Sequence, residues 1–142
     1  MLSLKHCVRV FVFQFMDTEV RYLLLRHKPL AEWPLAPVIG GVGVGDHLSD
    51  TILRQVEEET GIRRPQHIIG LADPGKELFG DVGLVEWPFA YQAGMPGQPG
   101  QQVVPGPNIA EYAWLSFEAA FQSLEIPLDR QSLVKLELSL RG

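Results

Sequence analysis

The chain has 142 residues, a length typical of one globular domain, so we expect residues 1–142 to fold as a single unit. It is 46% hydrophobic and 20% charged, which excludes a wholly disordered chain. Twelve basic against 17 acidic residues give a formal net charge of −5. That balance disfavours proteins that bind nucleic acid through its phosphates, and we expect no sequence-specific nucleic-acid partner.

The single cysteine and the apolar N-terminal segment provide information on the cellular location of the protein. Cys7 alone cannot form an internal disulfide or a cysteine-based zinc site, and we expect a reducing, cytoplasmic setting. The segment 8–16 contains Arg9 and Gln14 and is far shorter than the roughly 20 apolar residues of a membrane span. It also lacks the leader and cleavage site of a signal peptide. We therefore expect no membrane partner and predict a buried strand here.

The first half of the chain predicts two strands, a loop and a helix. Residues 4–15 and 20–26 are rich in β-branched and aromatic residues and are predicted to form an antiparallel hairpin with a turn at 16–19. Residues 27–38 contain three prolines and are predicted to be neither helix nor central strand. We expect a glycine-rich loop at 39–46. A helix is predicted over 47–60, because Leu48, Ile52 and Val56 recur every four residues and Gly61 provides a stop.

The second half predicts three strands and two closing helices. The strands are expected at 66–71, 82–92 and 109–115. Residues 93–107 are dense in Gly, Pro and Gln and form either a lid over a site or, as we favour, an unconstrained insertion. Ser116 is expected to cap a helix over 117–123, and Asp129 a final helix. This order of elements indicates an α/β fold, with a mixed sheet covered by helices on both faces.

The predicted helix ends in three successive glutamates, residues 57–59, with Asp46 just before the helix. Acidic side chains at a helix C-terminus repel one another and the negative end of the helix dipole. The pattern has two interpretations, a solvated acidic surface or a site for a hard divalent cation, whose binding offsets the repulsion.

The spacing around these glutamates is that of a known motif. Gly40 is followed after five residues by Asp46 and after seven more by the run RQVEEETGI, residues 54–62. The pattern resembles the Nudix box. The matching positions are Gly40, Arg54, Val56, Glu58, Glu59, Gly61 and Ile62. Asp46 and Gln55 stand where the family has glutamates. The run EYAWLS, residues 111–116, is similar to the strand and helix start that close Nudix domains, as in the members that hydrolyse dihydroneopterin and deoxynucleoside triphosphates.

The resemblance implies a single Nudix hydrolase domain over residues 1–142, with a mixed β-sheet sandwiched between α-helices. It implies an enzyme that holds Mg²⁺ or Mn²⁺ through Glu58, Glu59 and the carbonyl of Gly40. Arg54 is expected to orient these carboxylates. The implied reaction is attack of water on a phosphorus atom of a nucleotide or other nucleoside diphosphate derivative, without a covalent enzyme intermediate.

Gln55 is the main departure from the family pattern. Gln55, Glu58 and Glu59 lie three or four residues apart, on one side of the predicted helix. A glutamine is neutral and cannot act as the general base that the family's glutamate often provides. A carboxylate beyond the box is expected to replace it: Glu111 is the leading candidate, before Glu86 and Glu77. The corresponding acidic residue of relatives falls slightly earlier, at Asn108.

The substrate is predicted to be a small nucleotide or another compound with a diphosphate linkage. Arg26, which ends the second strand with His27 and Lys28, is a candidate phosphate contact, and Trp33 a candidate for stacking a ring. The alternatives are a solvated strand end and a core or edge aromatic. We favour an active enzyme over a catalytically weak nucleotide-binding or regulatory domain, and a homodimer is possible.

Overall fold

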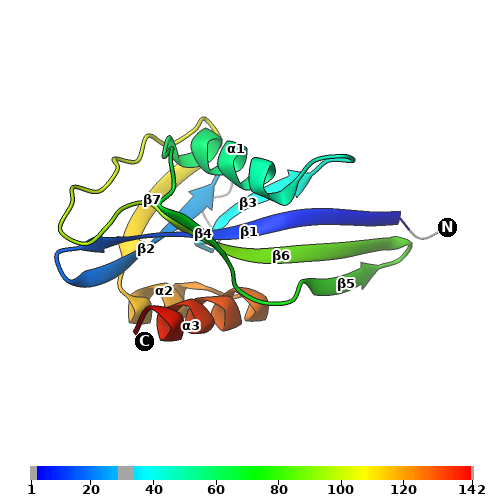
Figure 1. Ribbon diagram of the computed structural model, residues 1–142. Coiled ribbons are helices and arrows are strands. Elements are labelled where there is room, and N and C mark those ends of the chain that lie inside the picture. Colours follow the sequence, from blue (N-terminus) through cyan, green and yellow to red (C-terminus); the bar gives the residue numbers. More distant parts are fainter. Residues whose placement is uncertain (1–2, 29–33, 142) are drawn as a thin grey trace.

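The computed structural model describes residues 3–28 and 34–141, which form a seven-stranded mixed sheet with helices on both faces (Figure 1). The helix α1 covers one face, and α2 and α3 cover the other. This confirms the predicted α/β architecture. The strands are β1 (Ser3–Met16), β2 (Glu19–His27), β3 (Val38–Val42), β4 (His67–Gly70), β5 (Gly75–Phe79), β6 (Val82–Gln92) and β7 (Ile109–Leu115). The helices are α1 (Leu48–Thr60), α2 (Phe117–Ser123) and α3 (Pro127–Arg141).

The long strand β1 organises the sheet. Along one side it pairs with β6 in parallel over most of its length, from Ser3 to Phe13. Along its other side the first half pairs with β3 and the second half with β2, both antiparallel. The sheet order is β4-β6-β1-β2-β7, with β3 and β5 joined to β1 and β6. The β1–β2 hairpin was predicted from the sequence, whereas the parallel β1–β6 pair has no local signal.

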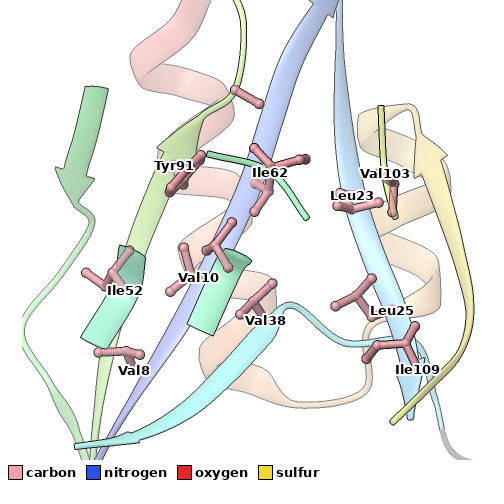
Figure 2. Close-up of a cluster of buried hydrophobic side chains, with 13 residues drawn as sticks. Val8, Val10, Leu23, Leu25, Val38, Ile52, Ile62, Tyr91, Val103 and Ile109 are labelled. Atoms are coloured by element: carbon pink, nitrogen blue, oxygen red, sulfur yellow. The ribbon is translucent and has the colours of Figure 1, made fainter. Parts of the chain in front are cut away.

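Alternation along the strands builds a core on each face of the sheet. Val8, Val10 and Val12 of β1 point toward α1, whereas Phe11 and Phe13 point toward α2 and α3. Figure 2 shows the cluster beneath α1, where side chains from five strands meet the helix and the segments that flank it. Because both faces of β1 are covered from Val8 to Phe13, this stretch of the strand is apolar except for Arg9.

Three elements differ from the sequence expectations. The expected loop at 39–46 begins with strand β3, whose glycines weaken the strand signal although its backbone pairs with β1. Strand β5 was not predicted, because nearly all its side chains are exposed and show no buried alternation. The final helix begins at Pro127, so Asp129 lies in its first turn and does not cap it.

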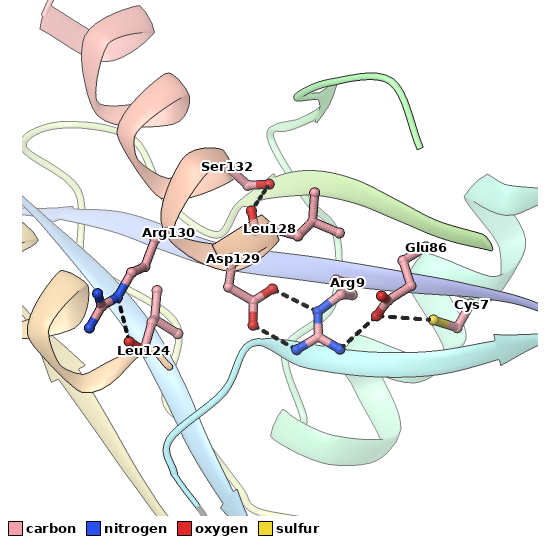
Figure 3. Close-up of polar contacts among 8 residues, drawn as sticks. All are labelled: Cys7, Arg9, Glu86, Leu124, Leu128, Asp129, Arg130 and Ser132. Atoms are coloured by element: carbon pink, nitrogen blue, oxygen red, sulfur yellow. Dashed lines mark hydrogen bonds and ion pairs between the residues drawn. The ribbon is translucent and has the colours of Figure 1, made fainter. Parts of the chain in front are cut away.

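Asp129 instead anchors α3 to the sheet through buried ions (Figure 3). Its two carboxylate oxygens accept from Nε and Nη2 of Arg9 at 2.6 Å, and Nη1 donates to Glu86 at 3.1 Å. Burial opposes the charge on Arg9, but Asp129 and Glu86 outweigh it and raise the pKa of the guanidinium. Burial, reinforced by the charge of Glu86, raises the pKa of the neighbouring Cys7 thiol to about 11.

The long segment 93–107 is tied to α1 over its second half. Val103 is buried in the core beneath α1. Val104 N donates to the carbonyl of Thr60 at 2.8 Å, and Gly106 N to that of Glu59 at 3.0 Å. These bonds satisfy carbonyls that a helix end leaves unpaired. This half of the segment is therefore a fixed strap, in contrast to the unconstrained insertion favoured from the sequence.

Candidate active site

One side of α1 carries the polar residues of the motif. Ile52 and Val56 are fully buried against the sheet and set the orientation of the helix. The helix ends at Gly61, whose φ of 73° lies in the left-handed region that glycine adopts without strain. Given this orientation, Gln55, Glu58 and Glu59 lie together beside the core face.

These three side chains form one wall of a cavity of about 230 Å³. The opposite wall is the segment 106–109, which includes Asn108. Both walls are held by backbone hydrogen bonds: Gly106 N donates to Glu59 O, and Lys28 N donates to Asn108 O at 2.8 Å. Asn108, the position at which the family resemblance predicts an acidic residue, therefore lies in the cavity with the glutamates.

Glu59 is the most buried polar residue of the cavity, with 8% of its surface exposed. Its Oε1 lies 2.7 Å from Nε2 of His27, at the end of β2. Its Oε2 is buried and has no hydrogen-bond partner among the described residues. Glu58 is exposed at the mouth. Burying a carboxylate oxygen without a partner is costly, which indicates that Oε2 is left for something that the protein binds.

Gly40 allows β3 to approach α1 closely at this site. A Cβ atom on residue 40 would lie 2.6 Å from Cγ of Gln55, well inside van der Waals contact. Gln55 is thereby held against the backbone of β3. A role for the Gly40 carbonyl as a metal ligand stays a prediction.

Arg54 lies outside the cavity. The guanidinium is half-exposed, with Nη1 at 4.0 Å from Oδ2 of Asp46. The same oxygen of Asp46 accepts a hydrogen bond from Gly43 N at 3.0 Å. In this arrangement Arg54 contacts the loop before α1, and its expected action on Glu58 and Glu59 stays a prediction.

Arg26 and Glu111 form an ion pair with each other across β2 and β7. Leu25 faces the core beneath α1, so the alternation of β2 directs Arg26 to the other face of the sheet. Glu111, its register partner, accompanies it there, away from Glu58 and Glu59. Glu86 also lies on that face, bound to Arg9. Trp33 lies outside the described residues.

His27 was not assigned to the metal site from the sequence, which identified it only within the end of the second strand. The only signal that could have found it is its odd-numbered position after Leu23 and Leu25, which places it on the α1 face. Its partner Glu59 lies 32 residues further along the chain.

The donor set suits a hard divalent cation. Glu58, Glu59 and the side-chain amides of Gln55 and Asn108 offer oxygen ligands, which Mg²⁺ and Mn²⁺ prefer. The unpartnered Oε2 of Glu59 supplies the buried oxygen that such an ion would satisfy. Only Glu58 and Glu59 of this set are anionic. Residues 3–28 and 34–141 contain no cluster of three or more His, Cys, Asp or Glu side chains arranged for a metal. The residues therefore fit a cation that shares its coordination with a ligand or water.

Comparison with protein-family models matches residues 5–136 to the NUDIX domain. A comparison with curated protein sequences found no match. In the described part of the chain, no helix combines the length and apolar character needed to cross a bilayer.

Solved structures share the fold at low sequence identity. A Listeria monocytogenes protein described as a NUDIX hydrolase superposes with a TM-score of 0.78 at 20% identity, covering 96% of this chain and 94% of that one. The C. elegans Ap4A hydrolase gives 0.75 at 15% identity, covering 97% and 98%. The E. coli dihydroneopterin triphosphate pyrophosphohydrolase gives 0.72 at 22% identity, covering 90% and 91%. At such low identity these likenesses establish the fold alone.

Proposed function

This chain belongs to the NUDIX domain family, and from that premise we propose that it is a divalent-metal-dependent hydrolase of a diphosphate linkage in a nucleotide or a nucleotide-like compound. The observation that carries the proposal is the cavity beside α1, into which Glu58 and the buried Glu59 bring two carboxylates. Oε2 of Glu59 is without a partner there. A cation bound there would compensate that charge and could in turn bind the phosphates of a substrate.

We assign Mg²⁺ or Mn²⁺ to Glu58 and Glu59, with the Asn108 amide oxygen and the Gly40 carbonyl as further donors. When bound, the ion neutralises phosphate charge and lowers the pKa of a bound water. Gln55 orients water or phosphate through its amide and takes no proton. The reaction is attack of water on one phosphorus and departure of the other phosphate, with no bond to the protein.

The neighbours support the choice of substrate class. One is named for hydrolysis of Ap4A and another for hydrolysis of dihydroneopterin triphosphate. A third, from Shewanella oneidensis, is a NUDIX domain in complex with ADP ribose. Each of these compounds contains linked phosphates, the feature that a cation between two carboxylates recognises. A single domain, a cytoplasmic location and a homodimer remain predictions from the sequence.

The test uses three adjacent glutamates. Purified protein with Mg²⁺ or Mn²⁺ is expected to release phosphate or pyrophosphate from at least one member of a nucleotide panel. Glu58→Gln and Glu59→Gln should abolish the release. Glu57→Gln is the matched control, because Glu57 pairs with Arg63 and does not line the cavity. Undiminished activity of both cavity variants would refute the assignment.

A second function, nucleotide binding with weak catalysis, is favoured by one observation. Two positions of the cavity wall, Gln55 and Asn108, carry neutral amides where the resemblance to the Nudix pattern leads us to expect carboxylates. A large increase in turnover on Gln55→Glu would indicate a slow enzyme that lacks its base. Unchanged turnover, together with tight nucleotide binding by calorimetry, would support the binding function.

A further inference from the structure

We propose that His27 is a positioning residue for Glu59, holding one carboxylate oxygen so that the other is presented to the cation. The inference rests on the proposed function, since it takes Glu59 as a metal ligand. It adds a residue outside the box motif, on a different element, to the machinery of the site.

The direction of the hydrogen bond follows from the ionised carboxylate that a metal ligand requires. Nε2 of His27 and Oε1 of Glu59 are 2.7 Å apart, and Glu59 is 8% exposed. An ionised carboxylate only accepts hydrogen bonds, so Nε2 carries the proton and donates it to Oε1. That bond restrains the rotation of the carboxylate group. The orientation of Oε2 is therefore set by a residue that itself needs no contact with the ion.

The alternation of the β2 backbone places His27 there. Leu23 and Leu25 face α1, and the two-residue period of β2 directs His27 to the same face. The β2–β7 ladder changes register at this point, since Arg26 pairs with Glu111 and His27 with Ile109, but the extra residue, Ala110, belongs to β7 and leaves the alternation of β2 uninterrupted. Such bulges are common beside functional sites.

The same stretch of backbone reaches the other wall of the cavity. Lys28, the next residue, donates its N–H to the carbonyl of Asn108 at 2.8 Å. The end of β2 thus touches both walls, Glu59 through the His27 side chain and Asn108 through the main chain. A displacement of this strand end would shift both at once.

The unpartnered oxygen is what a positioning role requires. A carboxylate held at one oxygen can still offer the other to an ion. Here one oxygen is bound by His27, while Oε2 has no partner in residues 3–28 and 34–141. Carboxylates that bind metals are themselves held by hydrogen bonds, and loss of such a partner costs about 10–100-fold in metal affinity.

The test measures Mn²⁺ binding to the full chain by calorimetry, without substrate. His27→Ala is expected to raise the Kd for Mn²⁺ about 10–100-fold relative to wild type. His27→Gln, whose amide N–H can also donate to Oε1, should recover most of the affinity. His67→Ala, at an exposed position of β4, is the matched control and should leave the Kd unchanged. If the alanine variant does not fold, His27→Leu, which fills similar space without an N–H, replaces it in the comparison.

The outcomes separate the two proposals. If wild type binds Mn²⁺ and His27→Ala binds it equally well, the positioning role is overturned and the proposed function stands. Tighter binding by His27→Ala would show that His27 competes with the ion, and failure of His27→Gln to recover any affinity would show that an N–H donor to Glu59 is not what sets it; either result overturns the inference. A wild-type protein that binds no Mn²⁺ and hydrolyses no nucleotide overturns both.

Discussion

The contact between residue 106 and the last turn of α1 makes Gly106→Ala the most informative single substitution. A Cβ atom on residue 106 would lie 2.2 Å from the carbonyl oxygen of Glu58. Both partners are backbone, so neither can rotate away as a side chain would. Gly106 is not among the described residues with positive φ, so the effect arises from the close approach and not from the dihedral angles.

The expected loss of stability in Gly106→Ala follows from the movement of backbone that the new Cβ atom requires. Ordinary contact requires the strap to withdraw from α1 by about 1 Å, which breaks the bonds of Val104 N to Thr60 and of Gly106 N to Glu59. Each such hydrogen bond contributes about 1 kcal/mol net, and strain in a packed contact adds about 1 kcal/mol or more. We expect a loss of about 3 kcal/mol in the free energy of unfolding. For a domain of this size that lowers Tm by roughly 10 °C.

The assay is thermal and urea unfolding followed by circular dichroism, with Mn²⁺ affinity measured in parallel. Affinity should fall, since the strap forms the cavity wall opposite Glu58 and Glu59. Gly41→Ala is the control: a Cβ atom there would meet nothing within 4 Å, so stability should change by no more than about 0.5 kcal/mol. A Gly106→Ala protein that melts with wild type and binds Mn²⁺ equally would refute the reasoning.

Three further predictions concern other contacts. Asp129→Asn should lower the free energy of unfolding, measured with urea, by about 3 kcal/mol. This value is at the low end for a broken buried ion pair, because Arg9 still pairs with Glu86. The Cys7 thiol, with its pKa raised to about 11, should be almost entirely protonated at pH 8. Alkylation of the native protein should therefore be slow there and accelerate until the pH approaches 11; fast labelling at neutral pH would contradict the burial. Gly40→Ala should lower the free energy of unfolding by about 1–3 kcal/mol, because its Cβ atom would contact Gln55. In the double variant, Gln55→Ala should restore part of this loss. If the losses of the two single variants simply add in the double variant, contact with Gln55 is not the cause.

Most of the fold could be predicted from the sequence, because its elements carry strong periodic patterns. The strands β1, β2 and β6 are rich in apolar residues, and α1 has an apolar stripe with a glycine stop. The strands β3 and β5 were not predicted, for different reasons. Strand β3 is short and contains glycines, which weaken the sequence signal of a strand. Strand β5 has its side chains in solvent and therefore shows no apolar alternation.

The site could be predicted only where its residues share one helix. Gln55, Glu58 and Glu59 are grouped by helical spacing, and this grouping follows from the sequence alone. The partners of Arg26 and Glu59 depend on strand register, which decides the face that each side chain occupies. The contact of Gly106 with α1 joins segments that only tertiary packing brings together, and no local pattern indicates it.

The parallel pairing of β1 with β6 has a consequence for how the protein is made. The first strand cannot acquire this neighbour until residue 92 has left the ribosome, because Phe13 pairs with Gln92. At about 5–20 residues per second, the intervening synthesis takes roughly 4–16 seconds. During that interval β1 and α1 are present in the nascent chain before β6, against which β1 pairs, has been made. The central pair of the sheet therefore closes only after about two thirds of the chain has been synthesised.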